Sequence, residues 1–217
     1  MRTTMTLTLA VLLSLGFAVT SFAAITGSAH DLRNWGGNGE DRICAFCHTP
    51  HHALTTGAPL WSRAPSTTAY TPLYDSNTFD GTISNQLAGP SGLCMSCHDG
   101  VLAVDSYYGA TGGTGSGSDN WGGYAVGLTN GLGNDHPIGF TYDTALATTD
   151  GELHDPASAT FVGSPTSVTV ASVLSGGIMT CATCHDVHNS KSLTGAETYL
   201  LYGTQVGSGI CLSCHDK

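Results

Sequence analysis

The chain is poor in charge, and especially in positive charge. Only 10% of its 217 residues are charged, and six basic side chains stand against sixteen acidic ones. Nucleic-acid binding depends on Lys and Arg, which neutralise the phosphates, so this composition argues against a nucleic-acid partner. With so few charges, the surface must be covered by Ser, Thr, Asn and Gly, or be buried against other subunits.

Long apolar runs are absent except for one at the start of the chain. Arg2 precedes an apolar stretch over residues 7–19, and residues 21–23 (Ser-Phe-Ala) resemble a small-x-small cleavage pattern. This arrangement predicts a signal peptide over residues 1–23, with an uncleaved membrane anchor as the alternative. No later segment is apolar enough to span a bilayer. We therefore expect a secreted protein, extracellular or at the cell surface, with the periplasm as the alternative.

No cysteine lies outside one recurring pattern, Cys-x-x-Cys-His, which occurs four times. Two thiols at this spacing can add to the two vinyl groups of one porphyrin, and the histidine that follows is then placed to ligate the iron. The sequence therefore predicts four covalently bound haem c groups. The predicted attachment residues are Cys44, Cys47, Cys94, Cys97, Cys181, Cys184, Cys211 and Cys214, and the predicted proximal ligands are His48, His98, His185 and His215.

Disulfides and structural zinc are the alternative uses of eight cysteines outside the cytoplasm. Each of them explains the even number of cysteines. Neither explains why a histidine follows the second cysteine of every pair, whereas haem attachment accounts for both features.

Each iron also needs a second axial ligand, and His and Met are the ordinary choices. Met95 and Met179 lie too close to their own motifs to reach across a haem. His51 and His188 each lie three residues after the histidine of a Cys-x-x-Cys-His motif and share a helical face with it, so each can reach a neighbouring haem. The predicted distal ligands are His30, His51, His136 and His188, and His52 and His154 remain open as alternatives.

The mature chain divides into two similar halves, residues 24–108 and 131–217, joined by a Gly/Ser-rich loop over residues 109–130. Each half opens with a motif followed by a further histidine, and closes with a motif followed by aspartate. This pattern indicates an internal duplication of a two-haem unit. We expect the two halves to form one compact tetrahaem domain.

The expected fold class is a multihaem cytochrome c, mostly irregular, with short helices, few strands and a haem-dominated core. Glycine is abundant, at 29 residues, and long helical periodicity is absent. Each Cys-x-x-Cys-His motif is expected to form one or two helical turns. A short helix is predicted over residues 196–202 and a strand over 166–173, where apolar residues alternate. Folding should depend on cofactor attachment.

Four segments together resemble a known family of secreted multihaem cytochromes. They are residues 27–32 (Gly-Ser-Ala-His-Asp-Leu), 44–51 (Cys-Ala-Phe-Cys-His-Thr-Pro-His), 97–100 (Cys-His-Asp-Gly) and 135–139 (Asp-His-Pro-Ile-Gly). Haem number, length and motif order are most similar to the OmcE-like tetrahaem cytochromes, which polymerise into extracellular filaments, or nanowires. The resemblance implies that a histidine of one subunit ligates a haem of its neighbour. By its place near the mature N-terminus, His30 is the candidate for that role.

The function expected from these features is electron transfer, without an enzymatic reaction. Identical subunits in a filament, other redox cytochromes and extracellular electron acceptors are the expected partners. A monomeric periplasmic tetrahaem shuttle is the alternative within electron transfer. A multihaem reductase would need an iron with an open coordination position, and an adhesive fibre that happens to carry haem is the remaining possibility.

Overall fold

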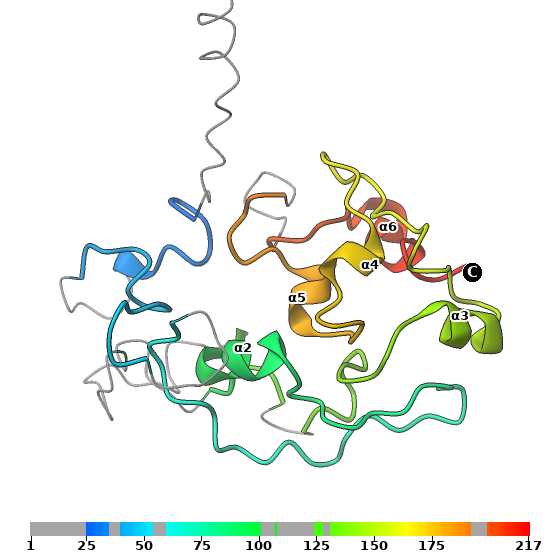
Figure 1. Ribbon diagram of the computed structural model, residues 1–217, viewed down its shortest axis with the longest axis horizontal. Coiled ribbons are helices and arrows are strands. Elements are labelled where there is room, and N and C mark those ends of the chain that lie inside the picture. Colours follow the sequence, from blue (N-terminus) through cyan, green and yellow to red (C-terminus); the bar gives the residue numbers. More distant parts are fainter. Residues whose placement is uncertain are drawn as a thin grey trace, which may run out of the picture.

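The computed structural model describes residues 25–34, 40–53, 60–100, 107, 124–127, 131–191 and 199–217. The predicted signal peptide and most of the 109–130 loop lie outside these residues. The described chain is mostly irregular and carries short helices (Figure 1). In order they are η1 (Leu32–Asn34), α2 (Pro90–His98), α3 (Thr144–Asp150), α4 (Val170–Val173), α5 (Cys181–Cys184), η3 (Val206–Ser208) and α6 (Gly209–Leu212). Within the described ranges, β pairing is confined to isolated bridges.

Local side-chain chemistry explains where several of these helices begin. The Asp143 carboxylate accepts a hydrogen bond from the backbone N–H of Leu146 at 2.9 Å and caps α3. Gly151 ends α3 in the left-handed conformation, with φ of 75°, which glycine adopts without a Cβ clash. Thr180 and Thr183 form a reciprocal capping box around the first turn of α5. This box fixes the backbone on which Cys181 and Cys184 lie.

The four Cys-x-x-Cys-His motifs each contain a helical turn, as the sequence predicts. The second motif ends α2. In the other three, the backbone N–H of the histidine donates to the carbonyl of the first cysteine: His48 to Cys44 at 2.8 Å, His185 to Cys181 at 3.2 Å and His215 to Cys211 at 2.9 Å. Each motif therefore presents its two thiols and its imidazole from one turn of backbone.

The predicted strand over residues 166–173 is wrong. Thr169 makes only an isolated bridge with Thr160, and the chain turns at once into α4. No neighbouring strand continues the pairing among the described residues, so the alternating apolar residues pack as a bend followed by a helical turn. Of the predicted helix over 196–202, residues 196–198 lie outside the described chain. Tyr199 and Leu200 adopt left-handed conformations rather than helical ones.

The predicted duplication has a structural counterpart at the first and third motifs. His48 forms an antiparallel bridge with Trp61, and His185 forms one with Leu201. One residue further on, the backbone N–H of Ser62 donates to the Cys47 carbonyl at 2.9 Å. In the second half, the N–H of Tyr202 donates to the Cys184 carbonyl at 3.1 Å. The segment after each of these motifs thus returns along it in the same register.

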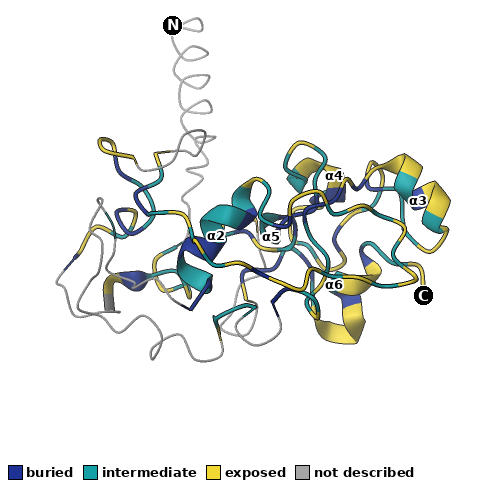
Figure 2. Cartoon of the chain, turned by 90° about the horizontal axis from the view of Figure 1, so that it is seen from below, coloured by how far each residue is buried: buried dark blue, intermediate teal, exposed yellow. Residues whose placement is uncertain are grey.

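The apolar core of the described chain is divided into three small clusters. The largest lies in the second half and is built around Phe140, Tyr142, Phe161, Val170 and Met179. A second cluster lies in the first half, around Leu32 and Phe46. A third joins Tyr70 and Met95 of the first half to Leu132 at the start of the second. Figure 2 shows that α2 and α5 are buried or half-buried along their length, whereas most of α3 and the end of α6 are exposed. Met95 and Met179 both pack in these clusters.

The two halves contact each other through α2 and α5, which lie side by side in both views (Figures 1 and 2). The Ser91 hydroxyl accepts from the backbone N–H of Cys181 at 3.2 Å. Gly139 connects the same regions through its backbone, donating to the Met179 carbonyl at 2.8 Å and accepting from Ser84 at 3.3 Å. No helix in the described ranges is long and apolar enough to cross a membrane.

Candidate haem-ligating site

Three histidine pairs bring the histidine of a Cys-x-x-Cys-His motif close to a second imidazole. Each pair joins a motif histidine to one of the three predicted distal ligands that the structure places beside a motif. The ring centres are 6.2 Å apart for His30 and His98, 6.1 Å for His48 and His188, and 6.4 Å for His136 and His215.

These separations fit two imidazoles that share one metal ion. Metal–imidazole bonds of about 2 Å on opposite sides of one ion place the ring centres roughly 6 Å apart. Direct stacking of imidazoles would bring the ring centres considerably closer. The donor set of the three pairs therefore fits haem iron with two axial histidines.

Backbone hydrogen bonds orient several of these rings. Nδ1 of His98 lies 2.8 Å from the Tyr124 carbonyl, and Nδ1 of His185 lies 2.8 Å from the Tyr199 carbonyl. In the distal set, Nδ1 of His136 lies 2.9 Å from the Pro137 carbonyl. A carbonyl only accepts, so Nδ1 carries the proton and Nε2 keeps its lone pair for a metal.

Electrostatics also favour the neutral, ligating form of three imidazoles. Burial lowers the pKa of His30, and nearby His98 lowers it further. The pKa of His215 is likewise lowered, first by burial and then by His136. For His185, packed protein atoms reduce the hydration of the ring and lower its pKa, although part of the residue stays open to solvent.

The attachment thiols of the second and third motifs meet at the contact between α2 and α5. The Cys94 and Cys181 thiols are hydrogen-bonded to each other, and this contact, with burial, raises the pKa of Cys94. Burial raises the pKa of Cys47 and of Cys184 to about 12 in each case. The two motifs therefore face each other through their sulfur atoms.

The remaining predicted ligands are placed differently. His51 and His52 are exposed, and His154 is half-buried. Among the described residues, none of these three makes a ring contact with the histidine of a Cys-x-x-Cys-His motif. No described residue of any kind makes a ring contact with His185. His30 lies against His98 of its own chain. Its predicted role at the haem of a neighbouring subunit stays a prediction.

Sequence reasoning did not find the pairing itself or the carbonyls that orient the rings. The duplication carries a usable signal, because each half contains an upstream histidine, and the structure pairs it with the last motif of the same half.

Groups of three or more metal-ligating side chains are absent from the described residues. A scan against protein-family models and a search of curated proteins found no match to the chain.

Proposed function

We propose that the chain is a tetrahaem c-type cytochrome that transfers electrons. The observation that supports this best is the set of three histidine pairs, each at the separation that one shared iron requires. Bound haem would supply a one-electron ferric–ferrous couple. Each motif would attach its haem through two cysteines and present one imidazole, and a second imidazole would come from elsewhere in the chain.

The residues of the three pairs favour electron transfer over catalysis. With both imidazoles of a pair bound to one iron, no coordination position would remain there for a substrate. Compared with His/Met ligation, two histidines favour a low reduction potential. Met95 and Met179 are buried in apolar clusters, so their side chains serve packing and are not placed to ligate an iron.

Haem content and coordination test this proposal directly. Intact mass and a pyridine haemochrome assay of the secreted protein should give four covalent haems per chain, with a low-spin ferric spectrum. Far fewer than four haems would contradict the proposal. Binding of carbon monoxide by the native ferrous protein would favour a multihaem reductase instead.

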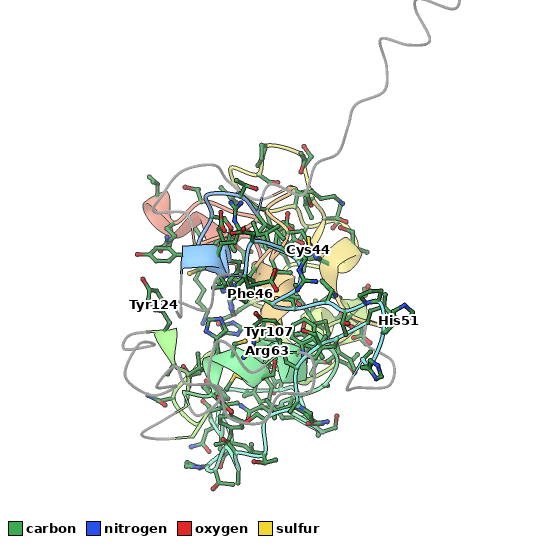
Figure 3. The ribbon with its side chains drawn as sticks, turned by 90° about the vertical axis from the view of Figure 1, so that its left-hand side faces the viewer. Cys44, Phe46, His51, Arg63, Tyr107 and Tyr124 are labelled. Atoms are coloured by element: carbon green, nitrogen blue, oxygen red, sulfur yellow. The ribbon has the colours of Figure 1, made fainter. Side chains whose placement is uncertain are left out.

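We further propose that the protein assembles into extracellular filaments in which His51 of one subunit ligates the haem held by His185 of the next. His188, the counterpart of His51 in the second half, reaches across to His48. The duplication therefore assigns His51 to His185. His51 is exposed and lies at the edge of the molecule in Figure 3, where a neighbouring subunit could approach it. A monomeric periplasmic shuttle is the alternative.

Electron microscopy of the secreted material distinguishes the two assemblies. His51→Ala should retain four haems and lose filaments. His52→Ala, at an adjacent residue that is also exposed, should keep them. Unchanged filaments in His51→Ala would contradict the bridging role. Discrete particles from the unmodified protein would favour the shuttle.

A further inference from the structure

Arg63 places a buried positive charge between the attachment sites of the first two motifs. Its side chain is fully buried, at 0% exposure. Its Nη1 donates to the carbonyl of Phe46, inside the first motif, at 3.4 Å. The guanidinium also acts electrostatically on the sulfur atoms of Cys47 and Cys97. Figure 3 shows Arg63 together with Phe46 and Tyr107 at the centre of the molecule.

The other basic residues of the described chain, by contrast, lie on the surface. They are Arg33, Arg42, Lys191 and Lys217, and all four are exposed. Water and salt screen exposed charges strongly, whereas a buried charge acts through a medium of lower dielectric constant. Among the described basic side chains, Arg63 is therefore the one whose charge should act most strongly on a haem attached nearby.

We propose that Arg63 raises the reduction potentials of the haems attached at the first and second motifs relative to those of the second half. This inference rests on the proposed function. Each reduction takes up one electron at a ferric iron and lowers its charge by one unit. A nearby fixed positive charge opposes the ferric state more than the ferrous state, so the reduction equilibrium shifts toward ferrous.

The net charge beside the attachment site should be more positive at the first motif than at the second. At Cys97, the negative charge of Asp99 opposes that of Arg63. Asp99 is buried beside this motif, and its carboxylate accepts from the Ser66 hydroxyl at 2.7 Å. At Cys47, Arg63 acts without an opposing contribution from Asp99.

The duplication supplies an internal comparison. Arg63 directly follows Ser62, which bonds to the Cys47 carbonyl, and Gly203 directly follows Tyr202, which bonds to the Cys184 carbonyl. A Cβ at Gly203 would already lie 3.2 Å from a side-chain carbon of Ile210 and 3.2 Å from a backbone oxygen. The second half thus carries a closely surrounded glycine instead of a cation at the equivalent position, and the two halves differ in charge there.

Spectroelectrochemical titration of the purified holoprotein, fitted as four one-electron components, tests the proposal. Arg63→Met should lower the equilibrium constant for reduction of the most affected haem about tenfold, or about 59 mV for one electron, and should also lower that of a second haem. Arg63→Lys keeps the charge and should restore most of the shift. Arg42→Met is the matched control, because Arg42 is exposed and paired with Glu40 in the same half, and it should leave the titration unchanged.

Two results would overturn the proposal while leaving the proposed function intact. One is an Arg63→Met protein with four haems and a titration identical to that of the parent. The other is an Arg63→Lys protein shifted as far as Arg63→Met. Proteins that carry no covalent haem, parent included, would instead contradict the proposed function.

A second measurement leaves Arg63 in place and serves if its replacement prevents folding. His188→Met changes the ligand opposite His48, so the component that moves identifies the haem of the first motif. In the parent, that component should be one of the two with the highest potential. If it is one of the two lowest, the proposal is wrong.

Discussion

His188 lies opposite His48 with its ring nearly parallel, at an interplanar angle of 14°. The two residues come from different halves of the chain. The other two pairs, His30 with His98 and His136 with His215, have crossed rings at 61° and 71°. Both crossed pairs join an upstream histidine to the last motif of its half. The proposed haem sites therefore fall into one parallel and two crossed arrangements.

Ring orientation predicts the magnetic signature of each site. Parallel imidazole planes separate the energies of the two π-type d orbitals of a low-spin ferric iron, whereas crossed planes leave them nearly equal. We expect the His48–His188 site to give an ordinary rhombic signal in low-temperature electron paramagnetic resonance, and the crossed sites to give strongly anisotropic signals.

Replacing His188 by Met should remove rhombic intensity equivalent to one haem per chain and leave the anisotropic signals in place. His154→Met is the control, since His154 makes no ring contact with an attaching histidine among the described residues. Undiminished rhombic intensity in His188→Met would rule out the assignment of this pair.

The attachment turns could be predicted from the sequence, but the pairing of the histidines could not. The turns follow from local spacing, since residues three and four apart share one helical face. The pairing of His188 with His48 depends on how two distant segments pack, and spacing showed only that His188 would reach a neighbouring haem. His30 illustrates the same limit: its place near the mature N-terminus gave no sign that it would pack against His98.

The failed strand over 166–173 has a different cause. Val168 and Val170 are both buried, at 6% and 0% exposure, so the alternation correctly marked residues that face the core. It did not reveal that, among the described residues, the β pairing of this segment would be confined to the single bridge between Thr160 and Thr169. Without a partner strand to continue the ladder, the chain closes a helical turn at Val170.

Replacing Gly139 by Ala should destabilise the contact between the two halves. Gly139 has φ of 83°, and a Cβ there would lie 2.2 Å from the backbone oxygen of Asn85. The left-handed conformation costs a non-glycine residue about 1 to 2 kcal/mol. Relief of the overlap by backbone movement should add roughly 1 to 3 kcal/mol.

Gly151→Ala is the matched control, because Gly151 has φ of 75° and its Cβ would meet nothing within 4 Å. It should show the conformational cost alone. Denaturant unfolding of both variants, followed by circular dichroism, measures the difference in the free energy of unfolding. Equal losses in the two variants would show that the close approach of Gly139 to Asn85 does not matter for stability.

Tyr142 should stabilise the second half through one buried hydroxyl. Its side chain is 2% exposed, and its hydroxyl donates to the His154 carbonyl at 2.6 Å. Tyr142→Phe removes this hydrogen bond and should lower the free energy of unfolding by about 1 kcal/mol. Tyr199→Phe, at a residue that is 55% exposed, should change it little.

The stabilising effect of Tyr142 should also depend on pH. Burial raises the pKa of Tyr142 above its ordinary value of 10, so in the folded state the phenol stays neutral after the unfolded chain has begun to ionise. The unfolded state then binds fewer protons than the folded state, and the stability that Tyr142 contributes is complete below pH 10 and falls as the pH rises beyond it. The difference in unfolding free energy between the parent and Tyr142→Phe should therefore narrow above pH 10. A difference that stays constant from pH 8 to well above pH 10 would mean that the hydroxyl ionises as readily in the folded chain as in the unfolded one, contrary to its burial.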